Sequence, residues 1–464
     1  MQLKTPTIRS MVRETGTLIV LFGIACIPLI GQVIALSILI VMAFGRPATT
    51  LKSLVAGTTV SLVTLMPVMR DVGANPLPVV LKWLLLFAAC ARSLVIDGEP
   101  TKIYGSLMKY WGLITGVLIL NAIFVSAVPS ISGFKAISFS LGLLCVIRLA
   151  MLTTNENSEM LLYISEMGSA VFILSVPLLP FEIGWARMNG AYFNGILLHS
   201  QTLGIYLVIT GAASFVAAFR LPRLQRVLIV SGLAQWSLIY FTKCRTALLA
   251  ILFCGTVYII EIFVRGGKKS RIRFVTAPVI TLTVLGLILL AMISADVRGG
   301  IASFAQKGDQ ESLLSTSDRS GVLQSGSRGW QIFDDVDLIE GHPLFGYGFG
   351  VNRDSEQFTN ANENHFEGIP LSAPVEQGFL PLATLAQIGI VGSLIIVPFL
   401  FSIYRSARQG SAEDAALFVA VLGVNFGEMI FYSFGSDGLI MWVVLVLIAV
   451  SGTIPRRYSR VLVR

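Results

Sequence analysis

The sequence predicts an all-α polytopic membrane protein, and three observations carry that prediction. Of the 464 residues, 55% are hydrophobic and only 13% are charged, which is too little charge to cover a soluble protein of this length. Apolar runs of roughly 20 residues recur along the chain, as in membrane-spanning helices. The net charge of +8 comes from basic residues in short loops between these runs, which indicates membrane topology rather than nucleic-acid binding.

The first apolar run, from Thr15 to Phe44, is too long for one ordinary span and short for two. Pro28 and Gly31 lie near its middle, which favours a tight hairpin of two short helices. One long tilted helix is the alternative. The candidate spans that follow the run are 50–69, 77–96, 103–125, 134–153, 160–180, 201–219, 227–243, 245–264, 274–293, 378–404, 415–434 and 439–453.

Basic clusters fix the expected sides of the membrane, because such clusters stay in the cytoplasm. Alternation from these clusters makes both termini cytoplasmic only if 15–44 crosses twice, and this gives about 14 transmembrane helices. We expect transmembrane helices over 1–293, including a periplasmic loop at 181–200, then a large periplasmic loop with short helices over 294–377, and C-terminal transmembrane helices over 378–464. The clusters are Arg220/Arg223/Arg226, Arg265/Lys268/Lys269/Arg271/Arg273, Arg405/Arg408 and Arg456/Arg457/Arg460/Arg464.

Within the large loop, a short amphipathic helix is expected after Arg328. Trp330, Phe333, Val336 and Ile339 recur every three residues, which predicts one apolar side with the aspartates of the stretch turned elsewhere. Gly341 and Pro343 are expected to end this helix. Beyond them, Gly346, Gly348 and Gly350 alternate with aromatic residues, so the backbone there can turn tightly or approach a ligand.

Three arginines are expected at the periplasmic boundary, where they oppose the positive-inside bias. They are Arg187, Arg245 and Arg328. Guanidinium groups bind diphosphate in a bidentate manner and keep their charge, and they would stabilise a diphosphate leaving group. The alternatives are a snorkelling boundary residue for Arg245, an interfacial aromatic belt around Arg187 and a solvated helix start for Arg328.

The chain has three histidines, His199, His342 and His365. His342, in Gly-His-Pro, suits packing or holding of a turn, and His365 is either a base or a solvated loop residue. The spacing of histidines and carboxylates predicts no metal site, and the sequence contains no phosphate-cradling Gly-Lys loop. We therefore expect no cofactor.

Four stretches resemble the bacterial O-antigen ligase and O-antigen polymerase family of polysaccharide-assembly membrane proteins, and together they cover roughly 185–405. A span junction around Lys243 and Arg245 resembles the family's Thr-x-Ser-Arg-x-Ala junction. The stretch containing Arg328 and Trp330 resembles the start of its large loop, and the stretch from His342 through Tyr347 and Gly348 resembles its His-Pro-x-x-Gly-x-Gly signature. The fourth, 386–392, resembles the Gly-x-x-Gly opening of the next span, and the loop from Arg187 to His199 is a weaker fifth match.

The resemblance implies a lipid-sugar-dependent (GT-C-like) membrane glycosyltransferase of the bacterial inner membrane, active at its periplasmic face. The donor would be a glycan on undecaprenyl diphosphate and the acceptor a second glycan, with metal-free inversion at the anomeric carbon. Arg245 and Arg328 match the family's essential arginines. Arg187, His199, Lys243, Trp330, His342, Tyr347 and Gly348 would contact substrate. A chain-length regulator and a flippase of the same assembly system are the expected protein partners.

The chain departs from the ligases of that family at one position. They carry an essential His-Asn pair before the Gly-x-x-Gly span, where this chain has Glu376 and Gln377. A carboxylate can act as a base toward a sugar hydroxyl, so Glu376 is the expected base, with His365 as substitute. The departure favours a polymerase of repeat units over a ligase to lipid A core. A flippase for the lipid-linked glycan and an inactive scaffold are the remaining alternatives.

Overall fold

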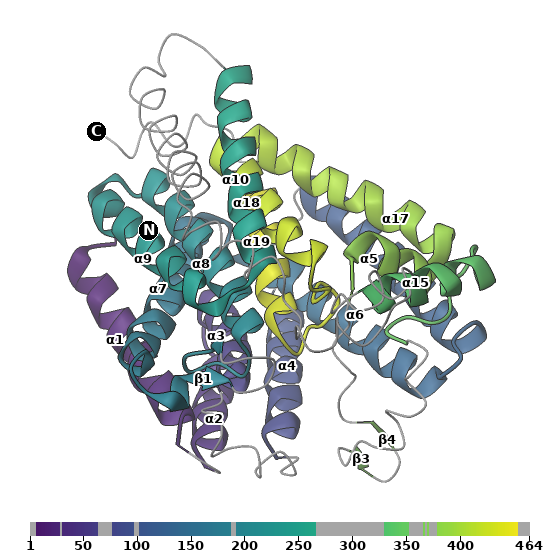
Figure 1. Cartoon of the computed structure of the whole chain (residues 1–464), viewed down its shortest axis with the longest axis horizontal. Helices are drawn as coiled ribbons and strands as arrows, with labels where there is room; N and C mark the ends of the chain where they lie inside the picture. Colours follow the sequence, from purple (N-terminus) through teal and green to yellow (C-terminus); the bar gives the residue numbers. More distant parts are fainter. Residues whose placement is uncertain are drawn as a thin grey trace, which may run out of the picture.

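The computed structural model describes residues 6–27, 30–63, 77–96, 102–186, 192–265, 329–351, 365–366, 369–370 and 378–452. For 102–103, 186, 329–333, 365–366 and 369–370 it describes the backbone alone. Within these ranges the chain is almost entirely helical (Figure 1). The helices of the first part of the chain are α1 (Ile8–Ala25), α2 (Gly31–Ala43), α3 (Pro47–Leu62), α4 (Leu77–Val95), α5 (Lys102–Phe124), α6 (Pro129–Leu152), α7 (Asn157–Ser175), α8 (Ser200–Arg220), α9 (Gln225–Thr242) and α10 (Arg245–Val264).

The later helices are α15 (Gly329–Gly341), α17 (Leu380–Gly410), α18 (Ala412–Gly423) and α19 (Asp437–Ser451). Two short antiparallel hairpins complete the fold, β1 (Trp185–Ala186) with β2 (Tyr192–Phe193), and β3 (His365–Phe366) with β4 (Ile369–Pro370). In Figure 1, β3 and β4 lie near the lower edge, whereas α10 rises toward the top. Single turns of 3₁₀ helix occur at Thr154–Glu156, Val176–Leu178, Glu182–Gly184, Pro222–Leu224 and Val424–Phe426.

Seven helices of the described part are long and apolar enough to cross a membrane, which confirms the prediction of an all-α membrane protein. They are α4, α5, α6, α7, α8, α10 and α17. Helix α1 ends at Ala25 and α2 begins at Gly31, as expected for two helices in the first apolar run. The short helix predicted after Arg328 is also confirmed, since α15 ends at Gly341. The count of about 14 crossings extends to 274–293, which lies outside the described residues, and stays a prediction.

The expected span 415–434 is wrong in its second half. Helix α18 ends at Gly423, and after one 3₁₀ turn the chain continues without helix to Ser436. This non-helical segment is largely buried, and its backbone and side chains are held by neighbours: Asn425 Oδ1 accepts from the Ile430 amide at 3.1 Å, and the Trp442 indole donates to the Phe431 carbonyl at 2.8 Å. Irregular backbone at membrane depth is tolerated where protein surrounds it in this way.

Helix α19 forms the centre of the fold and is buried on all sides from Asp437 to Val450. It packs against α3, α6, α7, α8, α17 and α18. The ring centroids of Phe139, Phe399 and Phe431 lie 4.5–5.8 Å from that of Trp442. A helix that is apolar all round is typical of a core position, and here it anchors the segment that precedes it.

A buried polar network joins α7, α8 and α9 around Gln235, which is fully buried. Its amide oxygen accepts from Thr210 Oγ1 at 2.7 Å, and its nitrogen donates to Ser231 Oγ at 3.1 Å and to Ser165 O at 3.3 Å. Gly168 makes room for it, because an added Cβ would lie 2.3 Å from the Gln235 amide oxygen. Hydrogen bonds between helices of this kind contribute to membrane-protein packing.

Replacing Gln235 by leucine is expected to destabilise the protein by about 1–2 kcal/mol, because several hydrogen bonds disappear while apolar contact is retained. Thermal unfolding in detergent micelles measures the effect. Ser237→Ala, on an exposed position of the same helix, is the control and is expected to change little. Equal melting temperatures for Gln235→Leu and Ser237→Ala would show that the network does not stabilise the helix contacts.

Candidate functional site

Two of the stretches that the sequence singled out, 341–350 and 386–392, are joined to each other by backbone hydrogen bonds. The amides of Tyr347 and Gly348 donate to the carbonyls of Ala386 and Gln387 at 2.7 and 3.1 Å. In the other direction, the amides of Ile390 and Val391 donate to the carbonyls of Pro343 and Leu344 at 3.0 and 3.1 Å. The loop after α15 and the first part of α17 therefore form one unit, and in Figure 1 α15 lies against α17.

A break in α17 at Gly389 makes this pairing possible. Gly389 has φ +63° and ψ −168° inside an otherwise helical segment. Such a conformation favours glycine, and it removes the neighbouring amides and carbonyls from the helix ladder. The loop satisfies them, as membrane proteins require of freed backbone groups. The approach is close, since a Cβ on Gly389 would lie 2.3 Å from the Leu344 carbonyl oxygen.

Asn121, near the end of α5, forms hydrogen bonds to the loop that follows α15. Its Nδ2 donates to the Phe345 carbonyl at 2.7 Å, and its Oδ1 accepts from the Phe349 amide at 2.8 Å. The Gln387 side chain adds a bond, since its Oε1 accepts from the Gly350 amide at 2.9 Å. Asn121 did not stand out in the sequence. The signal that could have found it is an amide side chain within a predicted span.

The loop presents only some of its predicted binding residues to the outside. His342 is exposed and its ring centroid lies 5.5 Å from that of Tyr347, which is half-buried against Val128, Ile131 and Val351. Gly348 is buried, and an added Cβ would lie 2.5 Å from Ser126 Oγ. Gly348 therefore packs against Ser126, whereas the sequence predicted that it contacts substrate.

Phe349, the last aromatic residue of the stretch 345–349, is not available to contact a ligand. It is fully buried, and its ring packs against those of Phe139 and Tyr432 with centroids 5.9 and 5.4 Å apart. Phe345 is 54% exposed, so the first part of the segment is the part that remains available for a ligand.

The junction between α9 and α10 contains Lys243, which has φ +50°, the left-handed conformation. It ends α9, and its ammonium lies 5.2 Å from the ring centroid of Tyr192 on β2. The junction and the 181–200 loop, which the sequence places on one side of the membrane, therefore lie together. A cation over an aromatic face is attractive, so a role for Lys243 in holding the loop accompanies its predicted role in binding.

Arg245 is the first residue of α10 and is half-buried, with its Nη2 atom fully buried. The positive end of the helix dipole adds to the guanidinium charge at this point. The adjacent Thr246 packs on Gly427, where a Cβ would lie 2.1 Å from Thr246 Oγ1. Gly427 is followed by Glu428, a half-buried carboxylate that our sequence reasoning missed. An acid within an expected span was the available signal.

A continuous series of contacts leads from this junction to α15. Phe426, before Gly427, stacks on Phe379 with ring centroids 5.3 Å apart. Phe379 is the N-cap of α17 and follows Gly378. A Cβ on Gly378 would lie 3.1 Å from Asp335 Oδ2. A series of packing contacts that passes through the Phe379–Phe426 pair thus links the Arg245 junction to Asp335.

Asp335 corrects the predicted orientation of the short helix. The sequence placed the apolar side along Val336 and Ile339 with Asp335 turned away, but Leu338 is the most buried of the helix's described side chains at 7% exposure. Asp335, one turn earlier, has a buried Oδ2 without a hydrogen-bond partner in the described structure. Burial raises the pKa of the Asp335 carboxyl to about 7, and the charge of Asp334 adds to this effect.

Several predicted residues have no described side chain. Arg187, Arg328 and Glu376 lie outside the described residues. Trp330 is in α15 and His365 in β3, each described by its backbone alone. His199 is described: it is the N-cap of α8, and its Nδ1 accepts from the Gln201 amide at 3.2 Å.

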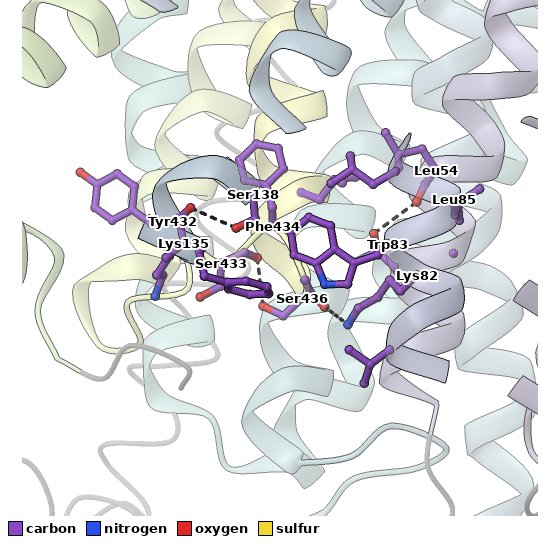
Figure 2. A pocket seen from close by; sticks show the side chains of 17 residues that line it. Leu54, Lys82, Trp83, Leu85, Lys135, Ser138, Tyr432, Ser433, Phe434 and Ser436 are labelled. Atoms are coloured by element: carbon purple, nitrogen blue, oxygen red, sulfur yellow. Dashed lines mark hydrogen bonds between the residues drawn. The ribbon is translucent and has the colours of Figure 1, made fainter. Parts of the chain in front are cut away.

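A cavity of about 270 Å³ lies between α3, α4, α6 and the segment 432–436 (Figure 2). Its described lining is largely apolar, with Trp83, Phe134 and Phe434 among its walls. Lys82 Nζ donates to the Gly435 carbonyl at 2.9 Å. Lys135, 3% exposed, lies on the opposite side of the labelled group in Figure 2. The two cations therefore do not converge on one anion position.

A second charged group lies between α1, α3 and α7. Lys52 Nζ is 2.9 Å from Glu14 Oε1 and 4.8 Å from the ring centroid of Tyr163, and Glu166 is fully buried nearby. This group is separate from the three arginines expected at the periplasmic boundary. Among the described residues, no cluster of His, Cys, Asp and Glu suits a metal ion.

No protein-family model matches the chain, and no curated protein matches it either.

Proposed function

We propose that the protein is a polymerase of lipid-linked oligosaccharide repeat units in the bacterial inner membrane. On this proposal about 14 helices cross the membrane, in the manner of lipid-sugar-dependent (GT-C-like) glycosyltransferases, with both termini cytoplasmic. The acceptor hydroxyl attacks the anomeric carbon of the donor glycan at the periplasmic face, and undecaprenyl diphosphate leaves. The transfer inverts the anomeric carbon and uses no metal.

The single observation that carries the proposal is the position of Arg245. A half-buried guanidinium at the amino end of a membrane-spanning helix is costly and suits a diphosphate, whose charge rises as the glycosidic bond breaks. The contacts from Thr246 through Gly427, Phe426 and Phe379 connect it to the loop carrying His342 and Tyr347. Arg328 and Arg187 complete the diphosphate clamp in this proposal, and Glu376, with His365 as substitute, is the base that the sequence favours.

The test uses the purified protein in lipid vesicles with a synthetic undecaprenyl-diphosphate oligosaccharide. Longer lipid-linked chains with release of undecaprenyl diphosphate are the expected products. Transfer only after lipid A core is added would identify a ligase. Release of undecaprenyl diphosphate without chain growth in either assay would contradict both.

A flippase is the second candidate, and the charged group of Glu14, Lys52 and Glu166 is the observation that favours it, because ionisable side chains within the membrane often mark transport pathways. The same vesicles distinguish it. Passage of intact substrate across the bilayer without elongation would overturn the polymerase. If Glu166→Gln leaves chain growth unchanged, the charged group is not required for transfer.

A further inference from the structure

The carboxylate of Asp335 is placed to meet a polar ligand. Its Oδ2 is buried and has no hydrogen-bond partner in the described structure, and such an atom is costly unless something pairs with it. Gly378, which has φ +126° and no side chain, lies beside this oxygen. A side chain there would be strained and would come within 3.1 Å of the oxygen. The position therefore leaves Asp335 Oδ2 facing bare backbone.

The relation of Asp335 to Arg245 suits a displacement reaction. The Phe379–Phe426 pair separates Gly378 from Gly427, and Gly427 in turn contacts Thr246. An inverting transfer needs a base on the side of the incoming hydroxyl and a positive charge on the side of the leaving group. The base and the positive charge would then lie on either side of the Phe379–Phe426 pair, and aromatic faces are common walls for apolar sugar surfaces.

We propose that Asp335, in place of Glu376 or His365, is the catalytic base of the transfer reaction, a proposal that rests on the function proposed above. The acceptor hydroxyl gives its proton to Asp335 Oδ2 as its oxygen bonds to the anomeric carbon. The bond from that carbon to the diphosphate breaks, and its electron pair stays on the diphosphate oxygen beside Arg245. The proton then leaves Asp335 to water, so the carboxylate is restored without a further reactant.

The charged neighbours of Asp335 determine how the reaction depends on pH. On its own helix Asp334 is adjacent, and Asp337 and Glu340 are exposed. Gly378, just before α17, is the described residue beside Asp335 Oδ2, the first turn of α17 carries no charge, and Arg405 and Arg408 lie at its other end. Burial and Asp334 raise the pKa of Asp335 to about 7. The base form therefore predominates only above that pH, and activity should rise with pH through about 7.

The experiment compares three aspartates of the same helix in the vesicle assay. Asp335→Asn is expected to lower elongation about a hundredfold or more at pH 8 and to leave binding of the donor lipid unchanged. Asp334→Asn is expected to move the rising limb of the pH profile to lower pH, because it removes a charge that raises the pKa of Asp335. Asp337→Asn is the matched control and is expected to stay within about twofold.

The melting temperature of Asp335→Asn distinguishes a catalytic role from a structural one. Because folding raises the pKa of Asp335, the folded protein holds this proton more tightly than the unfolded chain, and deprotonation above about 7 opposes folding. Asp335→Asn is therefore expected to melt no lower than the wild type at pH 8, while it loses activity. A lower melting temperature together with the loss would indicate a structural role and overturn the proposal.

The outcomes separate this inference from the proposed function. Absence of elongation by the wild-type protein contradicts the proposed function itself. An active wild type, with Asp335→Asn equally active and unchanged in its pH profile, overturns the role of Asp335 and leaves the polymerase intact. Partial activity in Asp335→Glu, with the limb still present, would support a base whose position is set by α15.

Discussion

Replacing Arg245 by lysine is expected to lower the rate of glycan transfer about a hundredfold while the protein stays folded. Lysine keeps the positive charge but offers one ammonium in place of a planar fork, so it loses the paired hydrogen bonds to a diphosphate. Removal of a single donor that stabilises a developing negative charge typically costs 10² to 10³ in rate, on the order of 3–4 kcal/mol. The effect belongs in kcat, because the extra charge exists only as the bond breaks.

The measurement is the rate of undecaprenyl diphosphate release in vesicles, with donor binding followed separately. Arg226→Lys is the matched control, since Arg226 is exposed near the opposite end of the α9–α10 helix pair. We expect the control to retain full activity and both variants to melt as the wild type does. Transfer by Arg245→Lys within threefold of the wild type would show that bidentate contact is not its role, and the diphosphate proposal would fall with it.

Hydropathy predicted most of the fold because it reports where a segment can be buried in an apolar medium. The positions of α4, α5, α6, α8 and α10 agree with the expected spans to within a few residues. The first apolar run was also divided correctly, since Pro28 and Gly31 are local signals that need no tertiary information. These features depend on the chain itself and on neighbouring residues, which is why the sequence alone identifies them.

The segment 415–434 was misread for a physical reason. It is as apolar as a span, but protein rather than lipid surrounds it, and protein can satisfy irregular backbone through groups such as Asn425 and Trp442. Hydropathy cannot distinguish these two surroundings. Hydropathy located α19 but could not show that protein surrounds it, because a helix with no exposed face carries no periodic pattern.

At the candidate site the sequence identified pieces but not their contacts. The stretches 341–350 and 386–392 were singled out separately, and their pairing depends on amides that only the break at Gly389 releases. The prediction turned Asp335 away from the buried side of α15, because the spacing of apolar residues shows only which side chains are hydrophobic. Contact with α17 decides which side chains are buried. Asp335 became a candidate only through that contact.

Replacing Gly389 by alanine is expected to cost about 3 kcal/mol or more and to abolish elongation. Alanine is strained at φ +63°, and each such backbone outlier costs on the order of 1–3 kcal/mol. The added Cβ would also lie 2.3 Å from the Leu344 oxygen and 2.5 Å from the Phe345 nitrogen, both backbone atoms. Relief requires the loop to leave α17, and the hydrogen bonds from Ile390 and Val391 to Pro343 and Leu344 are lost with it.

Thermal unfolding in micelles and elongation in vesicles check this prediction together. Gly255→Ala in α10 is the control, because Gly255 is helical and an added Cβ there would meet nothing within 4 Å. It should leave stability unchanged or raise it by up to about 1 kcal/mol, the helix preference of alanine over glycine. If Gly389→Ala melted with the control and elongated normally, the loop would not need the break in α17. If it melted lower but stayed active, the pairing would stabilise the fold without shaping the site.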